Sequence, residues 1–186
     1  MPFSFGRKEF EDVVMKSHWQ MFAGYNAWAN ERVFAAAAGL SDADYRADKG
    51  AFFKSVHGTL NHILVGDLVW MQRFTGEGPL PSSLDAILHE SLPALHQARR
   101  AQDARIIAYI ESLDDQALAG EIRYRPITTT GEIVQPLAPA LAHWFNHQTH
   151  HRGQVHALLT SLKSEAPSLD LVNFQREQGI GARRMG

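Results

Sequence analysis

The sequence predicts an all-α protein, a bundle of four long helices with a small β-hairpin or irregular insertion before the last of them. Apolar residues recur at helical spacing over four stretches of the chain. Segments rich in glycine, proline and serine, such as "GEGPLPSS" at 76–83, separate these stretches. One further stretch alternates apolar and polar residues and contains β-branched side chains. Four amphipathic helices in one short chain are typical of a helix bundle.

The first two helices have recognisable ends. The stretch "FEDVVMKSHWQMFAGYNAWANERVFAAAAGL" at 10–40 predicts a long helix that ends at Gly39 and is followed by the turn-like "SDAD". A second helix is expected from Ser55 to Thr75. Ser55 is a suitable N-cap, and Gly76 stands just past the end of this helix.

The second half of the chain contains the other two helices and the insertion. A third helix is expected from Ser91 to Leu113, because proline is tolerated in a first turn and Pro93 lies there. "GEIRYRPITTTGEIVQP" alternates and has Gly131 near its middle, which indicates a small hairpin. A fourth helix is expected from Leu137 to Lys163. The end, "LDLVNFQREQGIGARRMG", predicts a short helical element and a loose tail.

Composition limits the class of protein. A chain of 186 residues with 45% hydrophobic residues is expected to form one domain over 1–186, with a core at about 10–178. The net charge of −2 gives no basic surplus for a nucleic-acid backbone, so no nucleic-acid partner is expected. The chain has no cysteine, which excludes disulfides, a thiolate nucleophile and sulfur ligands for a metal. Neither a secretion signal nor a membrane span is apparent in the sequence, so a cytoplasmic protein is expected.

Histidines are concentrated in the fourth predicted helix, where "NHQTHHRGQVH" spans 146–156. His147 and His151 fall on one stripe with apolar residues such as Trp144 and Val155, whereas His143 and His150 lie at its margin and His156 points away. Residues four apart have Cβ atoms about 5–6 Å apart, so two imidazoles can share one ion. A buried imidazole without a partner costs about 1–3 kcal/mol. The pair is therefore either a metal site or a pair of core histidines with other partners.

A third ligand has to come from elsewhere, because the stretch is not the metalloprotease signature: Gln148 stands where that motif needs glutamate. The second predicted helix offers two histidines. His57 projects toward its main apolar side, and His62 projects away from it. Periodicity alone slightly favours His57.

Three stretches, "YNAWANERV", "HGTLNHILVGDLVWMQRF" and "FNHQTHHRGQVHALL", resemble the DinB/YfiT family of bacterial metal-binding four-helix bundles. The resemblance covers nearly the whole chain, and its most specific part is a His-x-x-x-His-Arg-Gly-Gln pattern. That pattern falls on His147 and on "HRGQ" at 151–154. The resemblance implies that the remaining ligand is His62 rather than His57. It thus predicts a metal site formed by His62, His147 and His151.

Three imidazoles leave coordination positions open, as in catalytic rather than structural metal sites. Zinc or nickel is the expected ion, with iron, manganese and cobalt as further candidates. The resemblance implies a metal-dependent enzyme, first an S-transferase that uses a small thiol as cosubstrate. A metal-assisted hydrolase and a non-catalytic metal-binding or stress-response protein are the alternatives, and the sequence indicates no catalytic residue beyond the ligands. A homodimer is also expected, because family members often pair and "WQMFAGYNAWA" at 19–29 is rich in apolar residues.

Polar residues among the apolar stripes need partners. Asp67 lies on the apolar side of the second helix and projects about 140° away from His62, so it is not expected to reach the same ion. It is expected either to orient a ligand histidine or to pair with an arginine or a tryptophan N–H. Asn26 and Asn30 are expected to tie helix ends or loops together.

Overall fold

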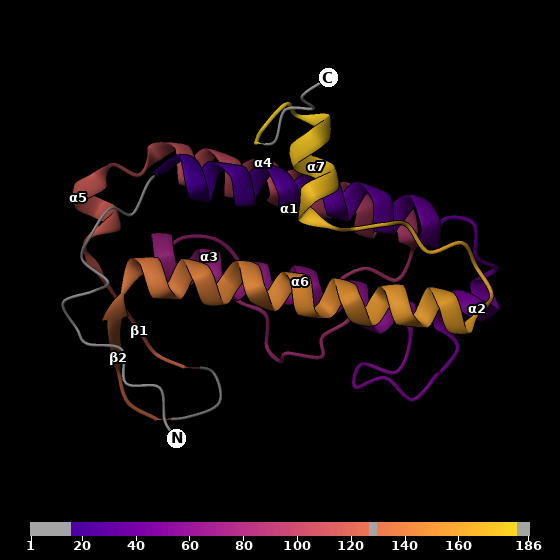
Figure 1. Ribbon diagram of the computed structural model, residues 1–186. Coiled ribbons are helices and arrows are strands. Elements are labelled where there is room, and N and C mark those ends of the chain that lie inside the picture. Colours follow the sequence, from indigo (N-terminus) through magenta and orange to yellow (C-terminus); the bar gives the residue numbers. More distant parts are fainter. Residues whose placement is uncertain (1–15, 127–129, 182–186) are drawn as a thin grey trace, which may run out of the picture.

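Four long helices form the body of the protein in the computed structural model, which describes residues 16–126 and 130–181 (Figure 1). They are α1 (Lys16–Ala37), α3 (Val56–Thr75), α4 (Leu92–Ser112) and α6 (Leu137–Ser161). Helices α1 and α4 form one layer, and α3 and α6 form the other (Figure 1). The predicted four-helix bundle is therefore confirmed.

The local sequence signals explain where these helices begin and end. Ser55 is the N-cap of α3, and its side chain accepts a hydrogen bond from the Gly58 N–H. Gly76 ends α3 in the left-handed conformation, with φ of 73°, which glycine adopts without steric cost. Pro93 lies in the first turn of α4, as predicted. The part of the expected first helix before Lys16 lies outside the described residues.

Smaller elements close the ends of the bundle. They are α2 (Asp42–Arg46), α5 (Asp115–Leu118), β1 (Glu121–Tyr124), β2 (Ile133–Pro136) and α7 (Leu171–Glu177). Strands β1 and β2 pair antiparallel, which confirms the predicted hairpin. The expectation of a turn at "SDAD" is wrong, because these residues begin the short helix α2. Ser41 caps α2 by accepting from the Asp44 N–H, and the same side-chain chemistry serves turns and helix starts.

Two apolar clusters fill the bundle, one toward the hairpin and one toward α2. The first includes Trp70, Ile106 and Trp144, and the second includes Leu60 and Leu95. Between them, along all four long helices, lies a layer of buried polar side chains: Asn26, Asn30, Asp67, Arg99, Asp103, Gln148 and Arg152. The core is thus interrupted by a polar layer near its middle.

Hydrogen bonds within this polar layer join all four long helices. Asp67 on α3 accepts from Arg99 on α4, from Gln148 on α6 and from the Trp144 indole N–H at 2.7 Å. Of the two roles expected for Asp67, the structure shows the pairing with arginine and tryptophan.

The asparagines of α1 complete the polar layer. Asn26 donates to Asp103 at 3.0 Å and accepts from Arg152. Asn30 also donates to Asp103. The expectation that Asn26 and Asn30 tie helix ends or loops together is wrong, because both lie in the interior and join α1 to α4 and α6. Buried polar groups of this kind require hydrogen-bond partners, and side chains on facing helices supply them.

Across the described ranges, no helix has both the length and the apolar content to cross a membrane.

Candidate metal centre

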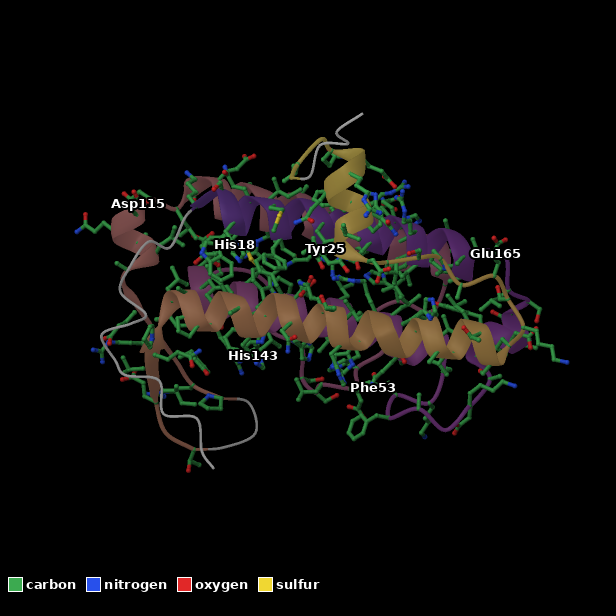
Figure 2. The ribbon with its side chains drawn as sticks, in the orientation of Figure 1. His18, Tyr25, Phe53, Asp115, His143 and Glu165 are labelled. Atoms are coloured by element: carbon green, nitrogen blue, oxygen red, sulfur yellow. The ribbon has the colours of Figure 1, made fainter. Side chains whose placement is uncertain are left out.

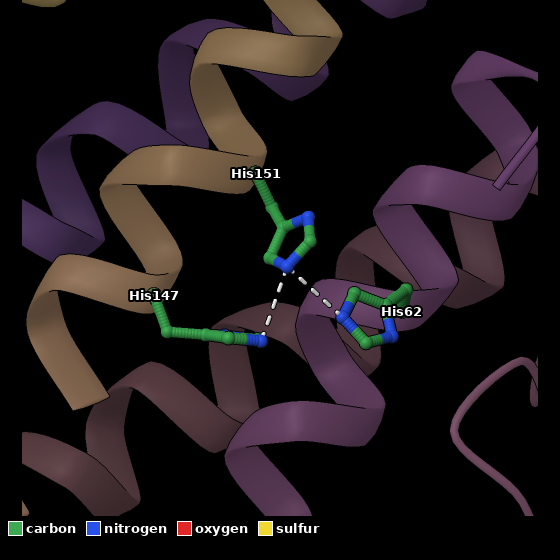
Figure 3. A group of neighbouring side chains, drawn as sticks. All are labelled: His62, His147 and His151. Carbon is green, nitrogen blue, oxygen red and sulfur yellow. Dashed lines mark hydrogen bonds between the residues drawn. The ribbon is translucent and has the colours of Figure 1, made fainter. Parts of the chain in front are cut away.

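Three histidines from α3 and α6 point toward one another (Figure 3). The Nε2 atom of His151 lies 3.2 Å from Nε2 of His62 and 3.1 Å from Nε2 of His147. One ring nitrogen from each residue falls within 4.8 Å of the others, and such a group could hold a metal ion. No carboxylate belongs to this group in the part of the chain that the structure describes.

The other candidate on α3, His57, lies elsewhere. Its Nε2 is 3.1 Å from the carbonyl oxygen of His89, and its ring packs beside Tyr45. Periodicity alone slightly favoured His57 as the partner of His147 and His151, and this preference is wrong, because His62 is the α3 histidine that lies beside them. Most of α3 is buried, because it contacts α2, α4, α6 and the hairpin, so its apolar side does not identify the face turned to α6.

Protein acceptors set the protonation of two of the three rings. The Nδ1 atom of His62 is 2.7 Å from the carbonyl oxygen of Leu84, which can only accept, so this Nδ1 carries the proton. The Nδ1 atom of His151 is 2.8 Å from the side-chain oxygen of Gln154 and donates in the same way. Each neutral ring then presents a lone pair at Nε2.

The Nε2 atoms of His62 and His151 lie only 3.2 Å apart without a proton on either, so their lone pairs repel unless both bind the same cation. This arrangement fits a metal ion, because metal-bound histidines usually donate the other ring N–H to an oxygen. His147 differs from the other two, since its Nδ1 is buried and has no hydrogen-bond partner among the described residues. The donor set therefore fits an ion, with two ligands oriented by the protein and one held by packing.

Packing around the histidines depends on residues that the sequence did not single out. The Phe53 ring stacks on His62 at a centroid distance of 3.7 Å. A Cβ atom at Gly66 would lie 2.9 Å from Cε1 of His147, so only glycine lets α3 approach this ring so closely. Neither Phe53 nor the Leu84 carbonyl carries a sequence signal, because both belong to irregular segments.

Burial keeps the three rings neutral. Desolvation, with smaller contributions from neighbouring histidines, lowers the pKa of His147 to about 3. Desolvation lowers the pKa of His151 to about 4, although the hydrogen bond to Gln154 opposes this effect. Desolvation also lowers the pKa of His62, against the hydrogen bond to Leu84. Neutral imidazole is the form that ligates a metal, so the site is ready to bind an ion at neutral pH.

These pKa values predict how the stability of the metal-free protein depends on pH. Unfolded histidines bind protons near pH 6.5, whereas the folded rings of His147 and His151 resist protonation down to about pH 3 and 4. The unfolded state therefore binds more protons as pH falls, and stability present above pH 6.5 is lost toward pH 4. Urea unfolding of the chelator-treated protein between pH 7.5 and about pH 4.5 measures this loss.

A double variant, His147→Phe with His151→Leu, is the matched control for this pH prediction. It removes two of the three rings whose pKa is lowered and leaves His62, so we expect a flatter dependence of stability on pH. A dependence equally steep in this variant and in the unaltered chain would contradict the assignment.

Comparison with known proteins identifies the family and agrees with the fold. The sequence profile of the DinB family matches residues 15–185. The chain is 26% identical to protein DinB of Bacillus subtilis (strain 168) over 150 residues, which are 73% of this chain and 80% of that protein. The crystal structure of a DinB-like protein from Bacillus cereus ATCC 10987 shares the fold, with a TM-score of 0.55 and 19% identity over 75% of this chain and 89% of that one. The protein is thus a helical bundle with a histidine cluster that could hold a metal ion, and it belongs to the DinB family.

Proposed function

We propose that His62, His147 and His151 bind one divalent first-row metal ion, zinc or nickel before the other candidates. The short distance of 3.2 Å between the unprotonated Nε2 atoms of His62 and His151 carries this proposal, because a cation bound by both removes their repulsion. Imidazole nitrogens suit these ions, and the chain has no cysteine to favour a softer set of ligands. Three protein donors leave at least one coordination position for an exogenous ligand.

We further propose that the protein is a metal-dependent S-transferase with a small thiol as cosubstrate. When bound, the ion supplies Lewis acidity and lowers the pKa of a coordinated thiol. The thiol sulfur then bonds to an electrophilic carbon, the leaving group departs with the electron pair of its bond, and the thiol proton passes to solvent. The sulfur has to come from a cosubstrate, because the chain has no cysteine.

The surroundings of the histidines favour a thiol over hydrolysis of an ester or amide. A metal-assisted hydrolase usually has a carboxylate beside the ion as general base. Here Gln148 follows His147, and Asp67, in the buried polar layer, accepts hydrogen bonds from Arg99, Trp144 and Gln148. A thiol needs no such base, because coordination to the ion deprotonates it.

Titration of the cobalt-substituted protein with 2-mercaptoethanol tests this function. We expect a saturable change in the visible spectrum, and no comparable change with ethylene glycol, which has a hydroxyl in place of the thiol. Consumption of the thiol with an alkyl halide should then depend on the metal. A spectrum that stays constant with thiol while cobalt remains bound would contradict the transferase, and ester hydrolysis by the same sample would favour the hydrolase.

A further inference from the structure

A cavity of about 850 Å³ lies between α1, α6 and the segment that leads into α7. Its walls include Trp19, Phe22 and Phe145, and Thr149 and Arg152 supply polar groups. It lies on the opposite side of α6 from the histidine cluster. In Figure 2, His18 and Tyr25, which line the cavity, lie between α1 and α6, whereas Phe53 and His143 lie on the other side of α6. The cavity is therefore separate from the candidate metal centre.

Arg152 is a buried cation whose direct neighbours are neutral. Its side chain donates to Asn26, to Asn30 at 3.3 Å and to Thr149 at 3.3 Å. Within residues 16–126 and 130–181 it forms no ion pair, and its Nε has no acceptor. Arg99, in the same polar layer, pairs with two carboxylates. Asp67 and Asp103 in the same layer stabilise the charge of Arg152 from a distance, but neither forms an ion pair with it. An anion in the adjoining cavity would give Arg152 a direct carboxylate partner.

Gly153 is the second residue that packing within the bundle does not explain. It lies inside α6, where glycine is less favourable than alanine by about 1 kcal/mol. A Cβ atom at this position would meet nothing within 4 Å, so no close contact requires glycine. Gly153 is exposed and lines the cavity, so a large side chain at this position would stand at the edge of the cavity next to Arg152.

We propose that this cavity binds a small organic carboxylate with an apolar body. The carboxylate would pair with Arg152 and Thr149, and the carbon chain would lie along Trp19, Phe22 and Phe145. A volume of about 850 Å³ and apolar walls with a few polar groups are typical of small-molecule sites. Asp170 is the carboxylate among the lining residues, and it is exposed to solvent. This inference does not depend on the proposed metal chemistry.

Calorimetric titration with octanoate tests the proposal, with 1-octanol as the uncharged ligand of matched chain length. We expect saturable binding of octanoate and at least about tenfold weaker binding of octanol, because the guanidinium pairs only with the anion. The variant Gly153→Phe should weaken octanoate binding without loss of thermal stability, because the phenyl ring would occupy part of the cavity next to Arg152. Ala157→Phe is the matched control, because Ala157 is exposed on the same helix outside the cavity, and it should bind octanoate normally.

Three results would overturn the proposal. They are an absence of saturable octanoate binding, equal affinities for octanoate and octanol, and unchanged octanoate binding in folded Gly153→Phe. Analytical ultracentrifugation of the unaltered chain and of Gly153→Phe gives a further check. A dimer of the unaltered chain that becomes a monomer in Gly153→Phe would show that a second copy of the chain occupies the cavity. Arg152→Gln adds a test of the charge, but Gly153→Phe leaves the buried polar layer intact and is the decisive variant.

Discussion

Replacing His147 by alanine is expected to remove the bound metal ion from the purified protein. Only the imidazoles of His62 and His151 would remain as ligands. Leu84 and Gln154, respectively, accept from the Nδ1 atoms of these rings, so each ring offers the ion only its Nε2 atom. We expect the same result for His62→Ala and His151→Ala, with metal content falling from about one ion per chain to near zero. Elemental analysis of proteins purified without added metal measures this change.

The controls are the histidines outside the cluster. His57→Ala, His143→Ala and His156→Ala should retain the ion, because none of these residues belongs to the group of nitrogens within 4.8 Å of one another. Near-stoichiometric metal in His147→Ala, or loss of metal in His156→Ala, would contradict the assigned ligands.

Asp67→Ala is expected to destabilise the fold by about 3–5 kcal/mol, because it removes one partner from a buried ionic group. Arg99 would keep only Asp103 as a carboxylate partner, and the Trp144 N–H and one Gln148 N–H would lose their acceptor. Urea unfolding of the chelator-treated variant measures the loss, so that metal binding does not contribute.

Glu31→Ala is the control for this prediction. Glu31 pairs with Arg100 at 2.6 Å at the surface, where an ion pair contributes about 0–1 kcal/mol. A loss for Asp67→Ala no larger than that for Glu31→Ala would show that the buried polar layer does not hold the helices together.

The sequence predicted the four long helices because each carries apolar residues at helical spacing, and α3 also has clear signals at both ends. Ser55 and Gly76 show this best, since a capping hydroxyl and a left-handed glycine act within one turn of chain. The proximity of His147 and His151 was also predictable, because residues four apart on a helix are neighbours on its surface.

The sequence predicted contacts between distant parts of the chain less well than it predicted the helices. His62 and His57 lie on different faces of α3. Because α3 is buried on most sides, its pattern of apolar residues does not show which face is turned to α6. The Leu84 carbonyl could not be found either, since every residue has one and the loop that places it has no periodic pattern. Arg99 and Asp103 lie in the polar layer of the core, and no pattern in the sequence distinguishes such a buried charged pair from an exposed one.

The candidate ligands come from distant parts of the chain, since 89 positions separate His62 from His151. In an unfolded chain only His147 and His151 are close together in sequence. The three nitrogens therefore come together only after α3 and α6 have packed against each other. An ion held by all three therefore binds the native state far better than the denatured ensemble, and free metal raises the apparent stability by mass action. Under the proposed metal binding, metal supply would act on the lifetime of the polypeptide as well as on its chemistry, because metal starvation would increase the unfolded fraction that proteases cleave.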